Sequence, residues 1–452
     1  MLQLPETIQV RLDADKGRGL FATQGIEVNS VIFQDEAPIA IGSMDVPPTA
    51  CCVCKRFVGS IQLQLHVLAE KIDMTEYETK ATQKAMEPFP DMTSNPSLPN
   101  APASSPGYVT YFSPSSSASI VCSKLCFDIV HVQAKHVFGP ELPLLLLPFG
   151  VDHLVLVAAL IGTTLYRLTQ QPILDWDAAV ADIMSLHAVK NTSLGDEPFQ
   201  AVMSYFPPET PALKYLNEHM TRSMFETFLG VIQANAVGVD IPSPISRYFA
   251  SCDENPDMKE KVVKDVSVLV ESTLQVLCAD EESEGEDENE DEDGSDEDSD
   301  DNESGNEDNN DDNAEGGRKK RAHDETVSSN GNDDEIITFT WQRDGAEALK
   351  FTSDVFPDST GMALFPTFSM LNHSCDPNCA IAYVGDSASI TVFATKPIAS
   401  GEELTISYID HNQAVYERQD ELKSRYGFTC VCARCSSSQK SKRKRSDKSS
   451  AA

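Results

Sequence analysis

Short stretches of strand-like pattern open the chain. Apolar and polar residues alternate over residues 8–12, and apolar runs follow at residues 20–22 and 31–33. A turn at residues 16–19 contains two glycines and separates the first two runs. Alternation with a period of two is typical of half-buried strands, and glycine is typical of turns. Residues 1–50 therefore predict a small antiparallel sheet.

A second strand-rich region lies far along the chain, over residues 336–411. Its apolar and β-branched runs fall at residues 336–341, 390–393 and 404–408. Runs of this composition are typical of strands. The charged stretch that follows, residues 413–426, predicts a short helix.

Helical spacing dominates between the two strand-rich regions. Apolar residues recur three and four positions apart in several blocks of residues 141–279, for example at 179–184 and 262–270. This period predicts a helical insert. The longest uncharged apolar run, residues 154–165, is too short for a membrane-spanning helix, so no membrane association is expected.

Residues 51–140 follow no regular pattern. A serine- and proline-rich stretch at residues 93–117 cannot bury a core and predicts a disordered loop between two cysteine pairs. The strand-rich regions can still form one domain, because the cost of closing a loop grows slowly with its length. We therefore expect an α+β fold in which the two ends of the chain pair.

The negative charge is concentrated in one segment. Of the formal net charge of -36, residues 280–312 carry 21 Asp and Glu without any Lys or Arg, which leaves a net -15 for the rest. Direct sequence-specific nucleic-acid binding is therefore not expected. Residues 280–335 predict an acidic, disordered linker.

Two short basic runs accompany the acidic segment. One lies at residues 318–321, and the other lies at residues 440–445 within a basic tail, residues 438–452. Such runs are typical of nuclear-import signals, of DNA contacts close to histones, or of simple solubilising charge. We expect the protein in the nucleus, the cytoplasm or both.

The cysteines lie in close groups. The N-terminus lacks the charged and apolar segments of a secretory signal, so a reducing, intracellular compartment is expected, where grouped cysteines favour metal binding over disulfides. Cys430, Cys432 and Cys435 lie within six residues. A tetrahedral zinc site needs a fourth ligand, for which Cys375 is a candidate. Taken alone, the three thiols are also compatible with a chance group or a redox pair.

Four sequence motifs, two of which include cysteines of this group, resemble motifs of a known family. Asn-His-Ser-Cys-Asp-Pro-Asn-Cys at 372–379, Gly-Glu-Glu-Leu-Thr-Ile-Ser-Tyr at 401–408 and Tyr-Gly-Phe-Thr-Cys at 426–430 resemble the C-terminal half of a SET domain. Lys-Gly-Arg-Gly-Leu-Phe-Ala-Thr at 16–23 resembles its opening segment. The four motifs stand in the family's order and extend over nearly the whole chain, which makes the resemblance specific.

The resemblance implies a protein-lysine N-methyltransferase that uses S-adenosyl-L-methionine. Asn372 and His373 match the pair that holds the cofactor, and Phe428 matches the aromatic residue that packs on its adenine ring. Tyr408 matches the tyrosine of the methyl-transfer channel, where a hydroxyl orients the lysine amine. The cofactor-binding candidates of the opening turn are Lys16, Arg18 and Gly19.

A second resemblance concerns the zinc-binding module of the SET-and-MYND group. Cys51 and Cys54 resemble the first cysteine pair of that module, and Cys122 and Cys126 resemble its third pair, which shares the same zinc. No cysteine lies between residues 55 and 121, and Gly139-Pro140 stands where the last ligand is expected, although His136 falls near the expected histidine. The resemblance therefore implies a divergent module with one Zn²⁺, and a vestigial loop of buried thiols is the alternative.

The combined interpretation is a mainly-β SET domain that is interrupted twice and ends in a zinc-bound segment. The expected units are residues 1–50, a partial MYND-like module at 51–140, the helical insert at 141–279, the linker at 280–335, the catalytic segment at 336–411, the post-SET zinc segment at 412–437 and the tail. Asn235, before the catalytic half, is a further candidate for the cofactor pocket.

The substrate implied by the resemblance is a histone or another basic protein, which the acidic segment attracts over a distance; a plain spacer is the other interpretation of that segment. A monomer is expected. Two rival functions remain open: a catalytically inactive SET-fold scaffold that binds basic proteins, and an acidic histone chaperone. The chaperone would leave the C-terminal cysteines without a role.

Overall fold

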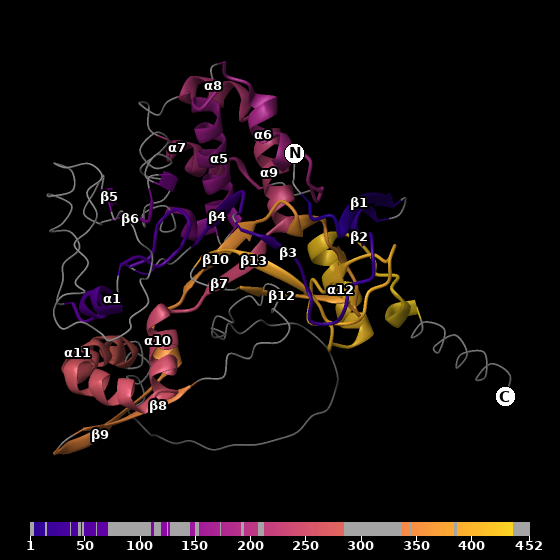
Figure 1. The fold of residues 1–452 in the computed structure, drawn as a ribbon. Coiled ribbons are helices and arrows are strands. Elements are labelled where there is room, and N and C mark those ends of the chain that lie inside the picture. Colours follow the sequence, from indigo (N-terminus) through magenta and orange to yellow (C-terminus); the bar gives the residue numbers. More distant parts are fainter. Residues whose placement is uncertain are drawn as a thin grey trace, which may run out of the picture.

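The computed structural model of the protein describes most of the strand-rich and helical regions (Figure 1). The described residues are 4–13, 16–36, 38–43, 47, 49–59, 61–70, 110–112, 119–123, 125–126, 145–149, 153–171, 173–190, 194–206, 212–283, 337–343, 345–383 and 387–436. The predictions for His136, for Gly139-Pro140, for the basic tail and for nearly all of the acidic linker lie outside them.

The opening segment forms the predicted antiparallel hairpin. Strand β1 (Ile8–Asp13) pairs with β2 (Gly17–Ala22) in a register that sets Ile8 opposite Ala22. Gly17 has a positive φ of 78°, a conformation that costs glycine little. The glycine therefore allows the tight reversal between the two strands.

Two three-stranded sheets join segments that are far apart in the sequence. In one, β13 (Ile390–Ala394) lies between β12 (Cys379–Tyr383) and β3 (Val31–Asp35). In the other, β10 (Ser359–Leu364) lies between β4 (Ala40–Gly42) and β7 (Val237–Ile241). The two ends of the chain therefore pair, as the sequence pattern predicts.

A buried carboxylate adds a further link between the ends. Asp35, at the end of β3, is only 8% exposed. Its Oδ2 accepts hydrogen bonds from the backbone N–H groups of Thr367 (2.9 Å) and Phe368 (2.8 Å), at the start of the 3-10 turn η4 (Phe368–Met370). Because a buried carboxylate needs such donors, these bonds fix the turn that precedes the Asn-His motif against the N-terminal strands.

A helical layer packs on the second sheet (Figure 1). Its helices are α5 (His153–Thr169), α6 (Trp176–Met184), α7 (Asp196–Ser204), α8 (Leu213–His219) and α9 (Arg222–Asn235). The central helix α5 is buried along most of its length and contacts β4. A Cβ at Gly42 would lie 2.8 Å from the backbone nitrogen of Leu156, so the glycine permits this close contact.

A second group of helices lies around an aromatic core. Helices α1 (Ile61–Leu68), α10 (Pro244–Asp253) and α11 (Pro256–Ser283) pack with the hairpin of β8 (Thr338–Arg343) and β9 (Ala346–Thr352) and the turn η3 (Ser353–Val355). Phe249 of α10 meets Trp341 edge to face, with ring centroids 4.9 Å apart. Such aromatic packing contributes about 0.5–1.5 kcal/mol per pair beyond the burial of area.

Three elements differ from the sequence-based expectation. Helix α1 lies in the stretch without a regular pattern, and β7 interrupts the helical insert. Strand β5 (Thr110–Phe112) lies within the segment expected as a disordered loop and pairs with β6 (Ser119–Val121). Helix α1 and strand β7 pack on partners that are distant in the sequence, such as α11 and β10, which local patterns do not reveal.

The remaining elements surround the C-terminal motifs. Strand β11 (Asn372–His373) runs parallel to β14 (Thr405–Ile406), and helix α12 (Val415–Tyr426) follows. The turn η1 (Leu147–Phe149) precedes α5. The mixture of small sheets and helices confirms the predicted α+β class. Among the described residues, no helix is both long enough and apolar enough to cross a membrane.

Candidate functional site

The C-terminal cysteines form one cluster, as predicted. The sulfur atoms of Cys375, Cys430, Cys432 and Cys435 all lie within 4.8 Å of one another. Cys375 Sγ lies 3.9 Å from Cys430 Sγ and 3.6 Å from Cys435 Sγ. A tetrahedral zinc ion with Zn–S bonds of about 2.3 Å requires sulfur atoms roughly 3.8 Å apart. The four thiols therefore fit one Zn²⁺.

Helix α12 carries two different faces beside this cluster. On the inner face, Arg418 and Leu422 are buried against the cysteines. Gly427 ends the helix in the left-handed conformation (φ 78°), which redirects the chain toward Phe428 and the terminal thiols. The helix thus holds the three terminal cysteines next to Cys375.

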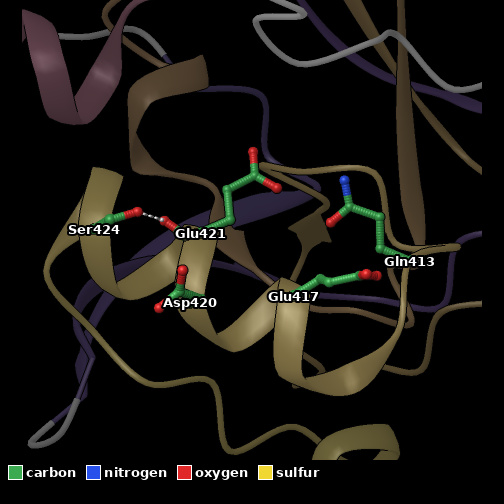
Figure 2. A pocket seen from close by; sticks show the side chains of 5 residues that line it. All are labelled: Gln413, Glu417, Asp420, Glu421 and Ser424. Carbon is green, nitrogen blue, oxygen red and sulfur yellow. Dashed lines mark hydrogen bonds between the residues drawn. The ribbon is translucent and has the colours of Figure 1, made fainter. Parts of the chain in front are cut away.

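The outer face of α12 borders an open, acidic hollow of about 540 Å³ (Figure 2). It is lined by Gln413, Glu417, Asp420, Glu421 and Ser424. One of its three carboxylates, that of Glu421, pairs with Arg425 at 3.0 Å. The hollow is a polar surface separate from the buried cysteine cluster and from the cavity at Tyr408 described below.

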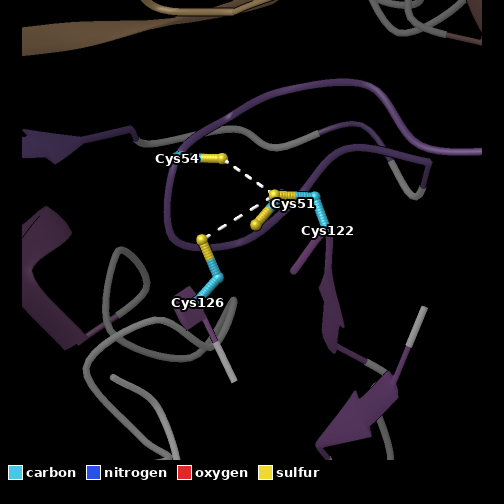
Figure 3. Close-up of side chains that lie close together, drawn as sticks. All are labelled: Cys51, Cys54, Cys122 and Cys126. Atoms are coloured by element: carbon cyan, nitrogen blue, oxygen red, sulfur yellow. Dashed lines mark hydrogen bonds between the residues drawn. The ribbon is translucent and has the colours of Figure 1, made fainter. Parts of the chain in front are cut away.

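The N-terminal cysteines form a second complete set (Figure 3). Cys51, Cys54, Cys122 and Cys126 also have all four sulfur atoms within 4.8 Å of one another. Cys54 Sγ and Cys122 Sγ lie 3.3 Å apart, and Cys122 Sγ and Cys126 Sγ lie 3.7 Å apart. Four thiols at these separations fit one Zn²⁺, which is the ligand set that the MYND-like resemblance implies.

A polar network joins the opening turn to the Asn-His motif. Asn372 Nδ2 donates to the carbonyl oxygen of Arg18 (3.1 Å) and to Oε1 of Glu403 (2.8 Å). The other oxygen of Glu403 pairs with Lys16 Nζ at 2.6 Å. A Cβ at Gly19 would lie 2.8 Å from Asn372 Nδ2, so the glycine makes room for this side chain. The structure brings these four predicted residues together around Glu403, which the sequence analysis did not select.

His373 connects the cysteine cluster to Tyr408. Its Nδ1 accepts a hydrogen bond from the backbone N–H of Tyr408 (3.0 Å), and its Nε2 lies 3.2 Å from Cys375 Sγ. Because Nδ1 is an acceptor, Nε2 carries the hydrogen and donates it to the sulfur. Both ring nitrogens are thereby occupied within the protein. The ring nitrogens of His373 are therefore not available to a ligand.

A narrow cavity lies between α9, the turn η4 and the end of β14. It has room for about 20 Å³, roughly the space of one water molecule. The lining residues are Ala234, Asn235, Ala236, Val237, Phe368, Ser369, Leu371, Ile406, Tyr408 and Tyr426. Two predicted residues, Asn235 and Tyr408, therefore share this cavity, whereas Lys16, Arg18 and Gly19 are not part of its wall.

Tyr408 is held on the cavity wall as a neutral phenol. Its hydroxyl donates to the carbonyl oxygen of Leu371. Burial raises the pKa of Tyr408 above its usual value, and the nearby Tyr426 and Glu403 raise it further. The hydroxyl is therefore a hydrogen-bonding group and not a base at neutral pH.

Asn235 and Phe428 approach this region from different elements. Asn235 Nδ2 donates to the carbonyl oxygens of His187 (2.7 Å) and Val231 (2.6 Å), which fixes the amide at the end of α9. Phe428 is 36% exposed, and its ring centroid lies 6.0 Å from that of His373 and 6.4 Å from that of Tyr408. A partly open aromatic face therefore stands beside the Asn-His motif.

Three residues of this site were not predicted from the sequence. Glu403 organises the polar network, and Tyr426 donates from its hydroxyl to the carbonyl oxygen of Tyr408 at 3.2 Å. Asn378 Oδ1 accepts the backbone N–H of Thr405 (2.9 Å) and so anchors β14. All three lie within the motifs at 372–379, 401–408 and 426–430, and these motifs were the signal from which they could have been selected.

Paired chain ends, a four-cysteine cluster behind the Asn-His motif and a tyrosine-lined cavity define a domain of the SET type. A family model for the SET domain matches residues 17–409. The chain therefore belongs to the SET domain family.

The chain is also similar to individual proteins of the SET-and-MYND type. It is 44% identical over 80 residues to the histone-lysine N-methyltransferase SMYD3 of Mus musculus, which is 18% of each chain. It is 42% identical over 84 residues to the N-lysine methyltransferase SMYD2 of Gallus gallus, 19% of each chain. It is 40% identical over 101 residues to the SET domain and MYND-type zinc finger protein 6 of Schizosaccharomyces pombe, 22% of this chain and 20% of the other. These matches cover about a fifth of the length of the relatives.

The two cysteine clusters predict two zinc ions per chain. Replacing one ligand in either cluster, by Cys54→Ser or Cys432→Ser, is expected to lower the zinc content of the purified chain by one, because three thiols hold zinc far more weakly than four. Cys252→Ala, in the core around α10, is the control and should keep both ions. Elemental analysis measures the content. One zinc in the unmodified chain would mean that the N-terminal thiols are only buried, and three would require a further site.

Proposed function

We propose that this protein is an S-adenosyl-L-methionine-dependent protein-lysine N-methyltransferase. The observation that carries the proposal is the position of Tyr408, a neutral hydroxyl held on the wall of a narrow, mainly apolar cavity. Membership of the SET family and the similarity to proteins named as lysine methyltransferases support it.

The residues near the cavity suit the cofactor. When bound, S-adenosyl-L-methionine supplies an electrophilic sulfonium methyl group. Phe428 offers a partly exposed ring for a flat base, and this ring lies beside the Asn-His motif. The Nδ2 of Asn235 already donates to the carbonyl oxygens of His187 and Val231, so its Oδ1 is the atom left to accept a hydrogen bond from an ammonium group.

The cavity is the place where the end of a lysine side chain would lie, and the side chains of its wall would have to move apart to admit it. Its apolar lining, from residues such as Val237 and Ile406, disfavours a charged ammonium group. Burial in this lining lowers the pKa of the incoming lysine and favours the neutral, nucleophilic amine. The same lining excludes water from the path of transfer.

Tyr408 orients that amine without exchanging its own proton. Its hydrogen points to the Leu371 carbonyl, so the phenolic oxygen keeps a lone pair that accepts an N–H of the amine. The amine lone pair is then directed away from Tyr408. Alignment of this kind accounts for much of the acceleration of a displacement reaction.

The proposed substrate is a histone or another basic protein. Two acidic regions support it, namely residues 280–312 in the sequence and the hollow on the outer face of α12. Opposite charges attract a basic chain over roughly a Debye length, about 10 Å at 0.1 M salt. The basic runs at 318–321 and 440–445 suit nuclear import, so we extend the proposal to a nuclear or cytoplasmic location.

Removing the Tyr408 hydroxyl tests the chemistry. Tyr408→Phe is expected to lower the rate of methyl transfer at least ~100-fold, because the amine loses its orienting partner, while the Michaelis constant for the cofactor stays the same. The matched control is Tyr416→Phe, whose ring is 68% exposed on α12. Labelled cofactor, fractionated cell extract and mass spectrometry reveal the methylated lysine. Full activity of Tyr408→Phe would refute the assigned role, and an unmodified chain that transfers no methyl group would favour the scaffold function.

Deleting residues 280–313 tests the recruitment of basic substrates. At low salt the deletion is expected to raise the Michaelis constant for a basic protein substrate several-fold, since long-range attraction is lost. At high salt the two proteins should behave alike, because screening removes the attraction in both. Replacing the acidic residues of the same segment by Ser and Asn is the control for length. An unchanged Michaelis constant at low salt would contradict the recruitment role.

A further inference from the structure

Buried cations are rare in this protein, and their positions are informative. Among the described residues, Lys55 (4% exposed) and Arg418 (2% exposed) are the only lysine or arginine side chains that are buried. Each lies beside one of the two cysteine clusters. Within the described part of the chain, neither forms an ion pair with a carboxylate, so the sulfur atoms are the available source of negative charge.

Lys55 belongs to the loop that carries the first cysteine pair. Its backbone N–H donates to the carbonyl oxygen of Cys51 (2.9 Å), and its positive φ of 61° turns the chain at this point. Its Nζ donates to the carbonyl oxygen of Cys52 at 2.8 Å. These bonds hold the ammonium group inside the loop that carries the first cysteine pair. Burial lowers the pKa of Lys55, and the neighbouring thiols of Cys52, Cys51 and Cys54 act in the opposite direction.

Arg418 reaches the other cluster from the inner face of α12. Its Nη2 lies 3.8 Å from Cys435 Sγ, within hydrogen-bonding range for sulfur, and its Nη1 donates to the carbonyl oxygen of Gln413. Cys375 and Cys435 are its electrostatic partners. The guanidinium therefore spans from the helix start to the sulfur atoms.

A buried, unpaired cation is strongly unfavourable, since removing a charge from water costs several kcal/mol. A zinc-bound cluster supplies the opposite charge. One Zn²⁺ that binds four thiols displaces four protons, and the resulting centre carries a net charge of two minus. One adjacent cation halves that net charge and lowers the cost of burying both.

We propose that Lys55 and Arg418 are built-in counter-cations, each of which sets the stability of the zinc site beside it. This inference rests on the proposal that both clusters hold zinc. Each cation would offset the negative charge of the zinc–thiolate centre beside it, so that the centre would release its metal more slowly than it would without the cation. The two sites are thereby stabilised separately, by residues that do not coordinate the metal.

The test is the rate of zinc release from the full-length, zinc-loaded chain. An excess of chelator removes the zinc, and a coloured zinc indicator follows the release of the two equivalents of zinc that each chain is expected to hold. Lys55→Met and Arg418→Met remove the charge and keep an apolar chain of similar length. Lys55→Met is expected to accelerate one equivalent about 10- to 100-fold, the usual effect of losing a group that supports metal ligands, and to leave the other unchanged. Arg418→Met is expected to do the reverse, and each variant serves as the control for the other.

Charge is separated from shape by a second set of variants. Lys55→Arg and Arg418→Lys keep the charge and are expected to release zinc within about threefold of the unmodified rate. Lys423→Gln removes an exposed cation from the same helix and should have no effect. Circular dichroism confirms that each variant is folded, and Cys54→Ser identifies which equivalent belongs to the N-terminal cluster.

Several results would overturn the proposal. If neither Met variant changed the rate of zinc release, the charge would be irrelevant. If one variant accelerated the release of both zinc equivalents, general destabilisation would be the cause. Acceleration by the charge-keeping variants, as large as with Met, would indicate a packing role. An unmodified chain with fewer than two zinc ions would refute the zinc assignment itself, whereas the other results would leave that assignment and the methyltransferase proposal intact.

Discussion

The site depends on the C-terminal cysteine cluster, in which four sulfur atoms lie close to one another. Cys375 and Cys430 are 55 positions apart, yet their sulfur atoms lie 3.9 Å apart. That closure sets α12 and Phe428 against the Asn-His motif. Through the ring of His373, the same cluster also fixes the backbone of Tyr408. The C-terminal cysteine cluster thus positions the wall of the cavity at Tyr408, although none of the four cysteines lines that cavity.

Buried hydrogen bonds between distant segments complete the arrangement. Asp35 ties the N-terminal strands to the turn before the Asn-His motif, and Glu403 joins that motif to the opening hairpin. Both carboxylates bond groups from distant segments, which couples the assembly of the site to the assembly of the fold. This rigidity matters for the proposed chemistry, because the alignment of an amine depends on fixed positions.

Several features of the fold and of the site could be predicted from the sequence. The paired ends, the helix before Gly427 and both cysteine clusters followed from local patterns and from motif order. Helix α1 and strand β7 could not be predicted, since their stability comes from partners such as α11 and β10. The motif assigned His373 to a ligand, but only coordinates show that both ring nitrogens are already bonded. Lys55 and Arg418 likewise read as ordinary surface cations until their burial is known.

The central claim is that this arrangement binds a sulfonium methyl donor, and calorimetric titration of S-adenosyl-L-methionine into the full-length, zinc-loaded chain tests it most directly. The account predicts binding at one site, with a large loss of affinity once a chelator has removed the metal and released α12 and Phe428. A zinc-loaded, folded chain that gives no heat of binding at several temperatures would contradict it.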